Sequence, residues 1–147
     1  MAVEEGLFVD AAQPSFEWEV TGANSRAQLA DLERRYQQVQ ADRLLEQGVT
    51  LVDPERFDLR GSLTAGTDVF IDLNTIFEGE VTIGNNVSIG SNCVIKDSRI
   101  LDGAVIKPFS HLEGAVVGAG AEVGPFARLR QGAELGSSSK IGNFVEV

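Results

Sequence analysis

The stretch IGNNVSIGSNCVIKDSRI at residues 83–100 decides the fold, because an aliphatic or aromatic residue returns at almost every sixth position around it. The spacing runs from residue 71 to the end of the sequence, at Ile71, Phe77, Ile83, Ile89, Ile95, Ile100, Ile106, Leu112, Val117, Val123, Leu129, Leu135, Ile141 and Val147. Only the intervals 95–100 and 112–117 are five residues long. A period of six fits neither an α-helix nor an alternating strand. It predicts a solenoid of short parallel strands over residues 69–147.

Two further columns follow the same period. The fourth position after each large apolar residue is usually small or β-branched, which implies a second inward column. The third position often holds a residue that tolerates left-handed backbone, namely Asn74, Asn86, Asn92, Gly103, Gly120 and Gly132. We expect these residues to form the corners between strands.

Phe109, Phe126 and Phe144 lie in one corner column, at spacings of 17 and 18 residues. We expect their rings to stack as a ladder with the spacing of hydrogen-bonded strands, about 4.8 Å. The ladder either packs within the coil or at its corner, or it contacts a second subunit.

The first third of the sequence has a different composition. Thirteen of the 16 glycines lie from Gly61 onward, and residues 24–48 consist mainly of good helix formers. Asn24 or Ser25 is a suitable helix cap, and Gly48 a suitable end. A narrow apolar stripe on this helix predicts an arm that touches a neighbour on one side, at Leu29, Leu32, Tyr36 and Val39.

Two short segments flank this arm. Phe16, Trp18 and Val20 alternate with glutamates, as in a half-buried strand. Asp53 and Pro54 indicate a turn within a connector at residues 49–68.

Charge and cysteine content exclude several classes of protein. The net charge of −10 makes nucleic acid and anionic membranes poor partners. Cys93 is the only cysteine, so no internal disulfide forms, and we expect a reducing, cytoplasmic setting. The N-terminus lacks the basic and apolar regions of a signal peptide.

Five hexapeptides, IGNNVS, IGSNCV, VGAGAE, VGPFAR and IGNFVE, resemble the repeats of acyltransferases with a left-handed parallel β-helix. In that family three hexapeptides make one triangular coil, so residues 71–147 correspond to about four coils. The left hand is implied by the resemblance and opposes the usual right-handed crossover. The expected fold class is mainly β, with one long linker helix before the β-helix.

A more specific resemblance covers residues 19–147. The segment EVTGANSRAQLADLERRYQQVQADRLLEQGVTLVDPERFDLRGSL, followed by VGPFARLRQGAEL and IGNFVEV, resembles the bacterial bifunctional N-acetylglucosamine-1-phosphate uridyltransferase and glucosamine-1-phosphate acetyltransferase. This family makes UDP-N-acetylglucosamine for cell-wall and lipopolysaccharide synthesis. The resemblance implies the tail of a uridyltransferase domain at 1–23, a helical arm at 24–48, a connector at 49–68 and the first acetyltransferase coils at 69–147.

The resemblance implies two binding residues and two cofactors. Arg130 corresponds to an arginine that contacts the sugar phosphate, and Asn24 to an asparagine that ligates Mg²⁺; acetyl-CoA is the acetyl donor. Residues 1–24 contain no glycine-rich phosphate loop, and the partners that ligate Mg²⁺ beside this asparagine in the family are absent, so helix capping is the alternative for Asn24. Arg128 and Arg130 flank Leu129, and strand alternation predicts that both point outward; a solvated surface pair is the alternative.

His111 is the only histidine and precedes the inward Leu112. It is a weak candidate for a general base, and an exposed residue of the coil is the alternative. The family's own lysine, histidine, tyrosine and acetyl-CoA residues correspond to positions beyond Val147. A single histidine also excludes the three-histidine zinc site of the carbonic anhydrases with this fold.

Two hypotheses for function remain open. The chain is a piece of the bifunctional enzyme, with a homotrimer, a sugar phosphate and UDP-N-acetylglucosamine as partners, or it is a non-catalytic trimerising scaffold or relic. In either case we expect the chain alone to be inactive and to bind neither Mg²⁺ nor acetyl-CoA, because both sites are incomplete.

Overall fold

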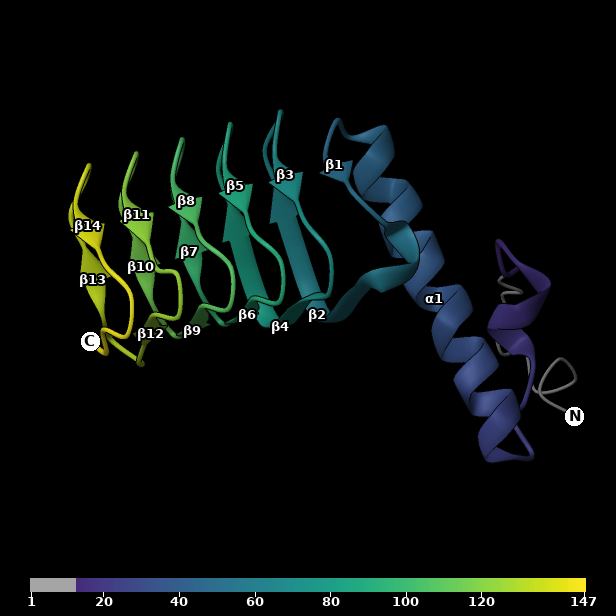
Figure 1. The fold of residues 1–147 in the computed structure, drawn as a ribbon. Helices are drawn as coiled ribbons and strands as arrows, with labels where there is room; N and C mark the ends of the chain where they lie inside the picture. The colour runs from purple at the N-terminus through teal and green to yellow at the C-terminus, as the bar shows by residue number, and fades with distance from the viewer. Residues whose placement is uncertain (1–12) are drawn as a thin grey trace, which may run out of the picture. The chain divides into compact units, whose positions relative to one another are not determined.

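The computed structural model describes residues 13–147 (Figure 1). It contains two compact units, which divide inside the long helix between Arg34 and Arg35. The second unit holds the rest of the helix and all the strands.

The first unit contains a short 3-10 helix, η1 (Glu17–Val20), where we expected a strand. That expectation was wrong. The amides of Glu19 and Thr21 donate to the carbonyls of Phe16 and Trp18, both at 3.1 Å. Because no strand within residues 13–147 pairs with this segment, its backbone groups bond to residues three positions away.

Helix α1 (Arg26–Glu46) begins with a variant of the capping box. The Gln28 amide donates to Ser25 Oγ at 3.2 Å, and the Gln28 side chain accepts from the Asn24 amide at 2.7 Å. Ser25 therefore caps the helix through its side chain, and Asn24 does not.

The C-terminal end of α1 is a Schellman motif. The Val49 amide donates to the Leu44 carbonyl at 3.0 Å and the Gly48 amide to the Leu45 carbonyl at 3.1 Å, while Gly48 has a φ of +89°. The predicted role of Gly48 is confirmed.

The buried face of α1 differs from the predicted apolar stripe. Gln37 and Ala41 are fully buried and Leu44 nearly so, whereas Leu29 is 60% and Tyr36 39% exposed. Sequence patterning missed this face because its first member is a polar residue, whose side chain bonds to the backbone of Leu59.

The strands form a three-sided parallel solenoid. The first side stacks six strands in this order: β1 (Thr50–Leu51), β3 (Phe70–Ile71), β5 (Ser88–Ile89), β8 (Val105–Ile106), β11 (Glu122–Val123) and β14 (Lys140–Ile141). The long strands β2 (Phe57–Ala65) and β4 (Thr75–Ile83) pair in register along their whole length.

The other two sides both continue from β4. One stacks β6 (Val94–Lys96), β9 (His111–Glu113) and β12 (Arg128–Leu129). The other stacks β7 (Arg99–Ile100), β10 (Val116–Val117) and β13 (Glu134–Leu135). The first half of β4 thus pairs on one side of the solenoid and its second half on the other.

Parallel pairing starts earlier than the solenoid expected over residues 69–147. Thr50 pairs with Phe70, and β2 pairs with β4 from Phe57 onward, so strands occupy part of the segment 49–68. Between β1 and β2 lies the 3-10 helix η2 (Pro54–Arg56), whose first amides are capped by Asp53. The six-residue phase continues in β2 at Leu59, opposite Phe77, but the small Ala65 stands opposite Ile83, so the repeat lacks a large apolar residue there.

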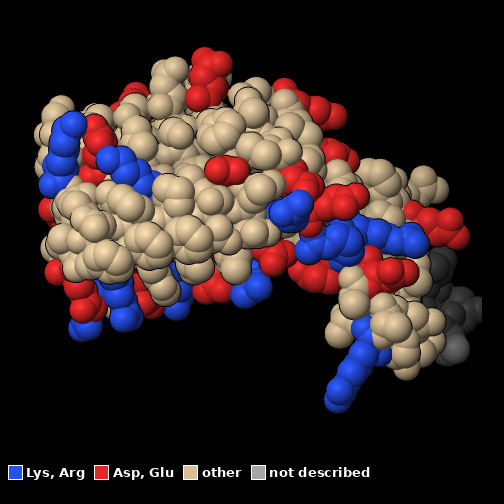
Figure 2. Space-filling view, in the orientation of Figure 1, with Lys and Arg blue, Asp and Glu red and all other residues tan. Residues whose placement is uncertain are grey.

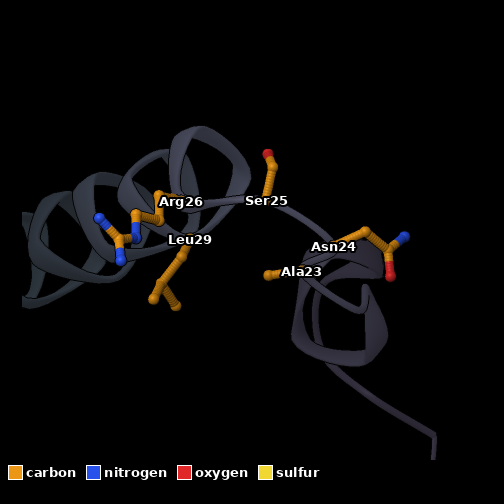
Figure 3. A pocket seen from close by; sticks show the side chains of 5 residues that line it. All are labelled: Ala23, Asn24, Ser25, Arg26 and Leu29. Carbon is orange, nitrogen blue, oxygen red and sulfur yellow. The ribbon is translucent and has the colours of Figure 1, made fainter.

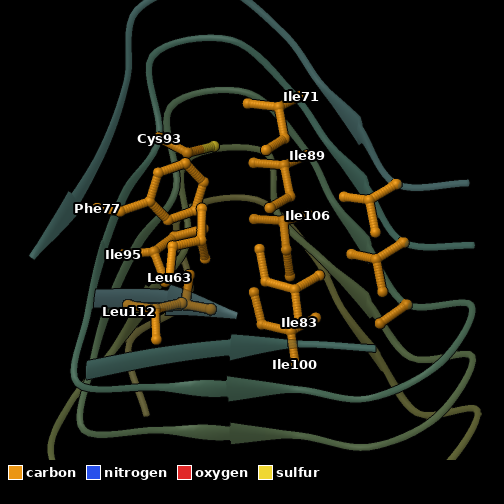
Figure 4. Close-up of a cluster of buried hydrophobic side chains, with 14 of the residues drawn as sticks. Leu63, Ile71, Phe77, Ile83, Ile89, Cys93, Ile95, Ile100, Ile106 and Leu112 are labelled. Atoms are coloured by element: carbon orange, nitrogen blue, oxygen red, sulfur yellow. The ribbon is translucent and has the colours of Figure 1, made fainter. Parts of the chain in front are cut away.

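The inward columns are confirmed from Ile71 to Leu129. Figure 4 shows Ile71, Ile89 and Ile106 in one stack and Phe77, Ile95 and Leu112 in another, inside triangular coils. Every large apolar position of this run is at most 2% exposed. Close packing of these stacks holds the solenoid together.

The two five-residue intervals lie at the same corner, in consecutive coils. Asp97 and Gly114 have left-handed φ values of 45° and 58° there, beneath Gly79 at 65°. Asp97 Oδ1 accepts the Glu80 amide at 3.0 Å. The carboxylate thus bonds a backbone donor of the coil above it.

The predicted corners and the phenylalanine ladder are confirmed. All six predicted corner residues have positive φ, as do Phe109, Phe126 and Phe144. Neighbouring rings are 4.9 and 5.3 Å apart, with interplanar angles of 4° and 14°. The side chains are 52%, 47% and 78% exposed, so the ladder lies outside the core.

Two buried serines give a matched test of hydrogen bonding in the coil. Ser98 Oγ donates to the Lys96 carbonyl at 2.6 Å and accepts the Ala115 amide at 3.1 Å, whereas Ser110 Oγ has no hydrogen-bond partner within residues 13–147. We expect Ser98→Ala to lower the free energy of unfolding by about 1–3 kcal/mol. Ser110→Ala should leave it unchanged or raise it. Urea unfolding of both variants measures the difference, and equal losses would contradict the assignment.

Candidate functional site

The candidate site lies on β12, where strand alternation places two arginines on one outer side. Leu129 is fully buried, and both flanking guanidiniums reach the carboxylate of Glu146. Arg130 bonds Glu146 Oε1 through Nε and Nη2, and Arg128 Nη1 lies 3.8 Å from the same oxygen. The outward, same-side placement of the pair is as predicted.

Glu146 was not singled out from the sequence. It pairs with Arg128 across the next coil. The coil length could have identified it, because the residue one coil further along the chain lies beside each outward side chain.

His111 lies beside Arg128 on the preceding coil. In the parallel register, His111 lies between Val94 of the preceding coil and Arg128 of the following coil. The residue itself is half-buried. The column therefore brings an imidazole, a guanidinium and, through Glu146, a carboxylate together in three consecutive coils. These are groups that bind phosphate or move a proton.

A row of charges of alternating sign leads to this site. Arg60 pairs with Glu78 at 3.1 Å, and Lys96 pairs with Glu113 at 3.2 Å. Figure 2 shows these two kinds of charge gathered along the lower edge of the β-helix. The hydrogen bond that the Lys96 ammonium donates to the Glu113 carboxylate raises the pKa of Lys96.

A second charged cluster lies on the first side of the solenoid. Glu122 accepts from Lys140 at 2.7 Å and pairs with Lys107 at 3.0 Å. Lys140, followed by Lys107, lowers the pKa of Glu122. These ions are exposed, so their contribution to stability is small and is screened by salt.

Among residues 13–147, the surroundings of Asn24 do not by themselves supply the ligands of a magnesium ion. Asn24 lines a shallow depression with Ala23, Ser25, Arg26 and Leu29 (Figure 3). These residues offer no carboxylate and include a cation, and in Figure 3 the Asn24 side chain points away from Arg26 and Leu29. Residues 13–147 also contain no cluster of three His, Cys, Asp or Glu side chains that could hold a metal ion. A hard cation needs several oxygens in near-octahedral array, so we derive no step through Mg²⁺.

These observations define a class of protein: a parallel β-helix of hexapeptide repeats with a basic cluster, His111, Arg128 and Arg130, on one outer side. Residues 59–147 match the family described as the GMPPB C-terminal domain, and the chain belongs to this family.

Curated relatives match over the whole chain. It is 60% identical over 146 residues to the bifunctional protein GlmU of Marinobacter nauticus and 65% identical over 147 residues to that of Methylibium petroleiphilum. These matches cover 99% and 100% of this chain but 32% of each relative, so the chain spans about a third of their length. The resemblance to the bifunctional family is confirmed.

A solved structure confirms the fold. The GDP-perosamine N-acetyltransferase of Caulobacter crescentus, in complex with CoA and GDP-perosamine, superposes with a TM-score of 0.63 at 21% identity. The match covers 78% of this chain and 57% of that one. The chain therefore forms a left-handed parallel β-helix preceded by one long α-helix.

The part of the chain that the structure describes has no helix both long enough and apolar enough to cross a membrane.

Cys93 gives a prediction about the interior of the coil. Burial raises the pKa of its thiol to about 11, and the sulfur lies 3.3 Å from the Lys107 carbonyl oxygen. Because the thiolate is the reactive form, we expect Cys93 to resist alkylation at pH 8 in the native chain and to react readily in urea. Mass spectrometry after iodoacetamide treatment measures this. Rapid native labelling would show that the coil opens at this rung.

Proposed function

We propose that this chain is part of a bifunctional enzyme that acetylates glucosamine-1-phosphate with acetyl-CoA and uridylates N-acetylglucosamine-1-phosphate to UDP-N-acetylglucosamine. The observation that carries the proposal is the extent of the GlmU match. It spans the helix, the connecting segment and the β-helix at 60–65% identity, far beyond what a shared repeat would give.

In this proposal the chain covers the junction of the two activities. Residues 1–23 belong to the uridyltransferase end, residues 24–48 form the linking arm, 49–68 the connector, and residues 69–147 form acetyltransferase coils. The division of the described chain inside α1, between Arg34 and Arg35, supports a junction within the arm.

Arg130 would bind the phosphate of the sugar substrate. A guanidinium binds phosphate through two parallel hydrogen bonds, and Arg128 and His111 lie on neighbouring coils of the same outer side. The Glu146 carboxylate already pairs with the Arg130 guanidinium. Phosphate therefore has to displace this carboxylate or share the guanidinium with it. Its oxygens also compete electrostatically with the phosphate for the same cation.

Acetyl transfer would need a base and a bound acetyl donor in addition to the phosphate contact of Arg130. The amine nitrogen bonds to the thioester carbonyl carbon, the C–S bond breaks, a base takes the amine proton, and CoA leaves as the thiol. Acetyl-CoA supplies the activated acetyl group when bound. We assign no catalytic residue here and keep His111 only as a weak candidate for the base.

A non-catalytic, trimerising scaffold is the second candidate function. The phenylalanine ladder favours this candidate. Its rings are exposed, and each of its residues has left-handed backbone. Bulky side chains rarely adopt this conformation. A contact with another subunit would explain why phenylalanine is retained at these corners.

The assembly prediction follows from the ladder. Phe126 stacks on both of its neighbours, so Phe126→Ala removes two ring contacts at once. We expect the wild-type chain to sediment as a trimer. The variant should dissociate at a protein concentration at least tenfold higher than the concentration at which the wild-type trimer dissociates. Phe70→Ala, which removes an exposed ring elsewhere, is the matched control. An unchanged sedimentation coefficient for Phe126→Ala would exclude the ladder from the interface.

The binding prediction concerns Glu146. An exposed phosphate contact to Arg130 is worth about 1 kcal/mol, which is too little for the chain to bind glucosamine-1-phosphate below millimolar concentration. We expect Arg130→Ala to abolish this binding and Glu146→Gln to tighten it several-fold, because the competing charge is removed. Glu113→Gln, in the same charged row, is the control. NMR titration measures all four chains, and equal affinities would contradict the role of Arg130.

The catalytic prediction separates the two candidate functions. We expect the isolated chain to release no thiol from acetyl-CoA in the presence of glucosamine-1-phosphate, because no preorganised group stabilises the charge that develops in the transition state. Turnover above a buffer blank that is lost in His111→Ala would show that His111 is the base. The full-length protein of the source organism should be active in the same assay, and its inactivity would favour the scaffold.

A further inference from the structure

The outer edge of β2 is the longest strand edge at the beginning of the β-helix. β2 has nine residues and pairs with β4, on one side. In parallel pairing the N–H and C=O of one residue point to the same neighbouring strand. The outward residues Ile76 and Thr82 of β4 donate forward, to Cys93 and Ser98 of the next coil.

Inward residues consequently direct their backbone groups backward, and Leu59 is the inward residue near the middle of the first half of β2. Leu59 is 4% exposed, so its N–H and C=O are shielded from water. Buried backbone groups require hydrogen-bond partners, and within the described residues β2 pairs with no strand other than β4.

The side-chain amide of Gln37 meets both requirements. Gln37 Oε1 accepts the Leu59 amide at 2.7 Å, and Gln37 Nε2 donates to the Leu59 carbonyl at 2.9 Å. Gln37 itself is fully buried. One amide thus reproduces the donor and acceptor that a neighbouring strand would present to Leu59.

Packing of α1 against the β-helix does not by itself require the hydrogen bonds between Gln37 and Leu59. Ala41 and Leu44 already bury apolar surface on the same face of α1. A buried amide without its partners is costly, so an apolar residue at position 37 would serve better if anchoring were the only need. The amide is matched to the backbone of β2.

An open strand edge is also a template for pairing with another chain. We propose that Gln37 ends the β-helix: its amide occupies the edge of β2 at Leu59 and prevents a strand of a second copy of this chain from adding there. The contact is distinct from the phenylalanine ladder, which runs along the side of the β-helix.

The test compares Gln37→Leu with Gln40→Leu in the full chain. Leucine has nearly the volume of glutamine and keeps the helix apolar contacts, and Gln40 is a half-buried glutamine of the same helix. For Gln37→Leu we expect the amide hydrogen exchange of Leu59, followed by NMR, to accelerate at least tenfold. Sedimentation should show species that grow with concentration beyond the wild-type assembly. Gln40→Leu should behave as wild type in both measurements.

Gln37→Glu keeps the test decisive if the leucine variant does not fold. The carboxylate retains an acceptor for the Leu59 amide but lacks the donor for the Leu59 carbonyl. We expect this variant to keep the far-UV circular dichroism of the wild type and to associate to an intermediate extent. Two results would overturn the proposal: unchanged exchange at Leu59 in Gln37→Leu, or faster exchange without any concentration-dependent growth in either variant.

Discussion

Parallel backbone hydrogen bonding from coil to coil is the constraint on which the rest of the structure depends. The amides of Phe70, Ser88 and Val105 donate to carbonyls in the next coil at 2.8–3.0 Å, and the register repeats every 17 or 18 residues. Once this register is set, the neighbours of each side chain are the residues one coil before and after it. The core stacks, the charged row and the aromatic ladder all follow from this one periodicity.

The sequence predicts what repeats, because the period of six directly reflects the three-sided coil. Ile89 and Ile106 could be placed inside, and Asn92 at a corner, from spacing alone, and the structure agrees. Where the chain does not repeat, pattern reasoning had less to use. In β2 the small Ala65 stands where β4 has Ile83, so the repeat of large apolar residues is interrupted, and a search for apolar residues at helical spacing passes over Gln37.

The candidate site was only half predictable for the same reason. Alternation about Leu129 places two guanidiniums outward together, and the resemblance singles out Arg130. Glu146 is the partner that was missed, although it lies one coil onward from Arg128. Contacts between coils join residues that are one coil length apart in the sequence. A motif within one hexapeptide therefore cannot include all the residues of a site built from several coils. A search one coil away from each outward charge finds these partners.

The corner column that ends in the phenylalanine ladder shows where the chain departs from what the fold alone needs. In the earlier coils this column holds Asn74 and Asn92, whose side chains bond each other at 3.2 Å and which tolerate left-handed backbone. Later coils hold phenylalanine on the same backbone, at a cost of order 1 kcal/mol or more per residue. Phe109 and Phe126 each lie two residues before a member of the basic cluster, His111 and Arg128. The coils that carry His111, Arg128 and Glu146 are therefore the coils that carry phenylalanine on left-handed backbone, whereas the coils of Glu78 and Lys96 carry asparagine at this corner.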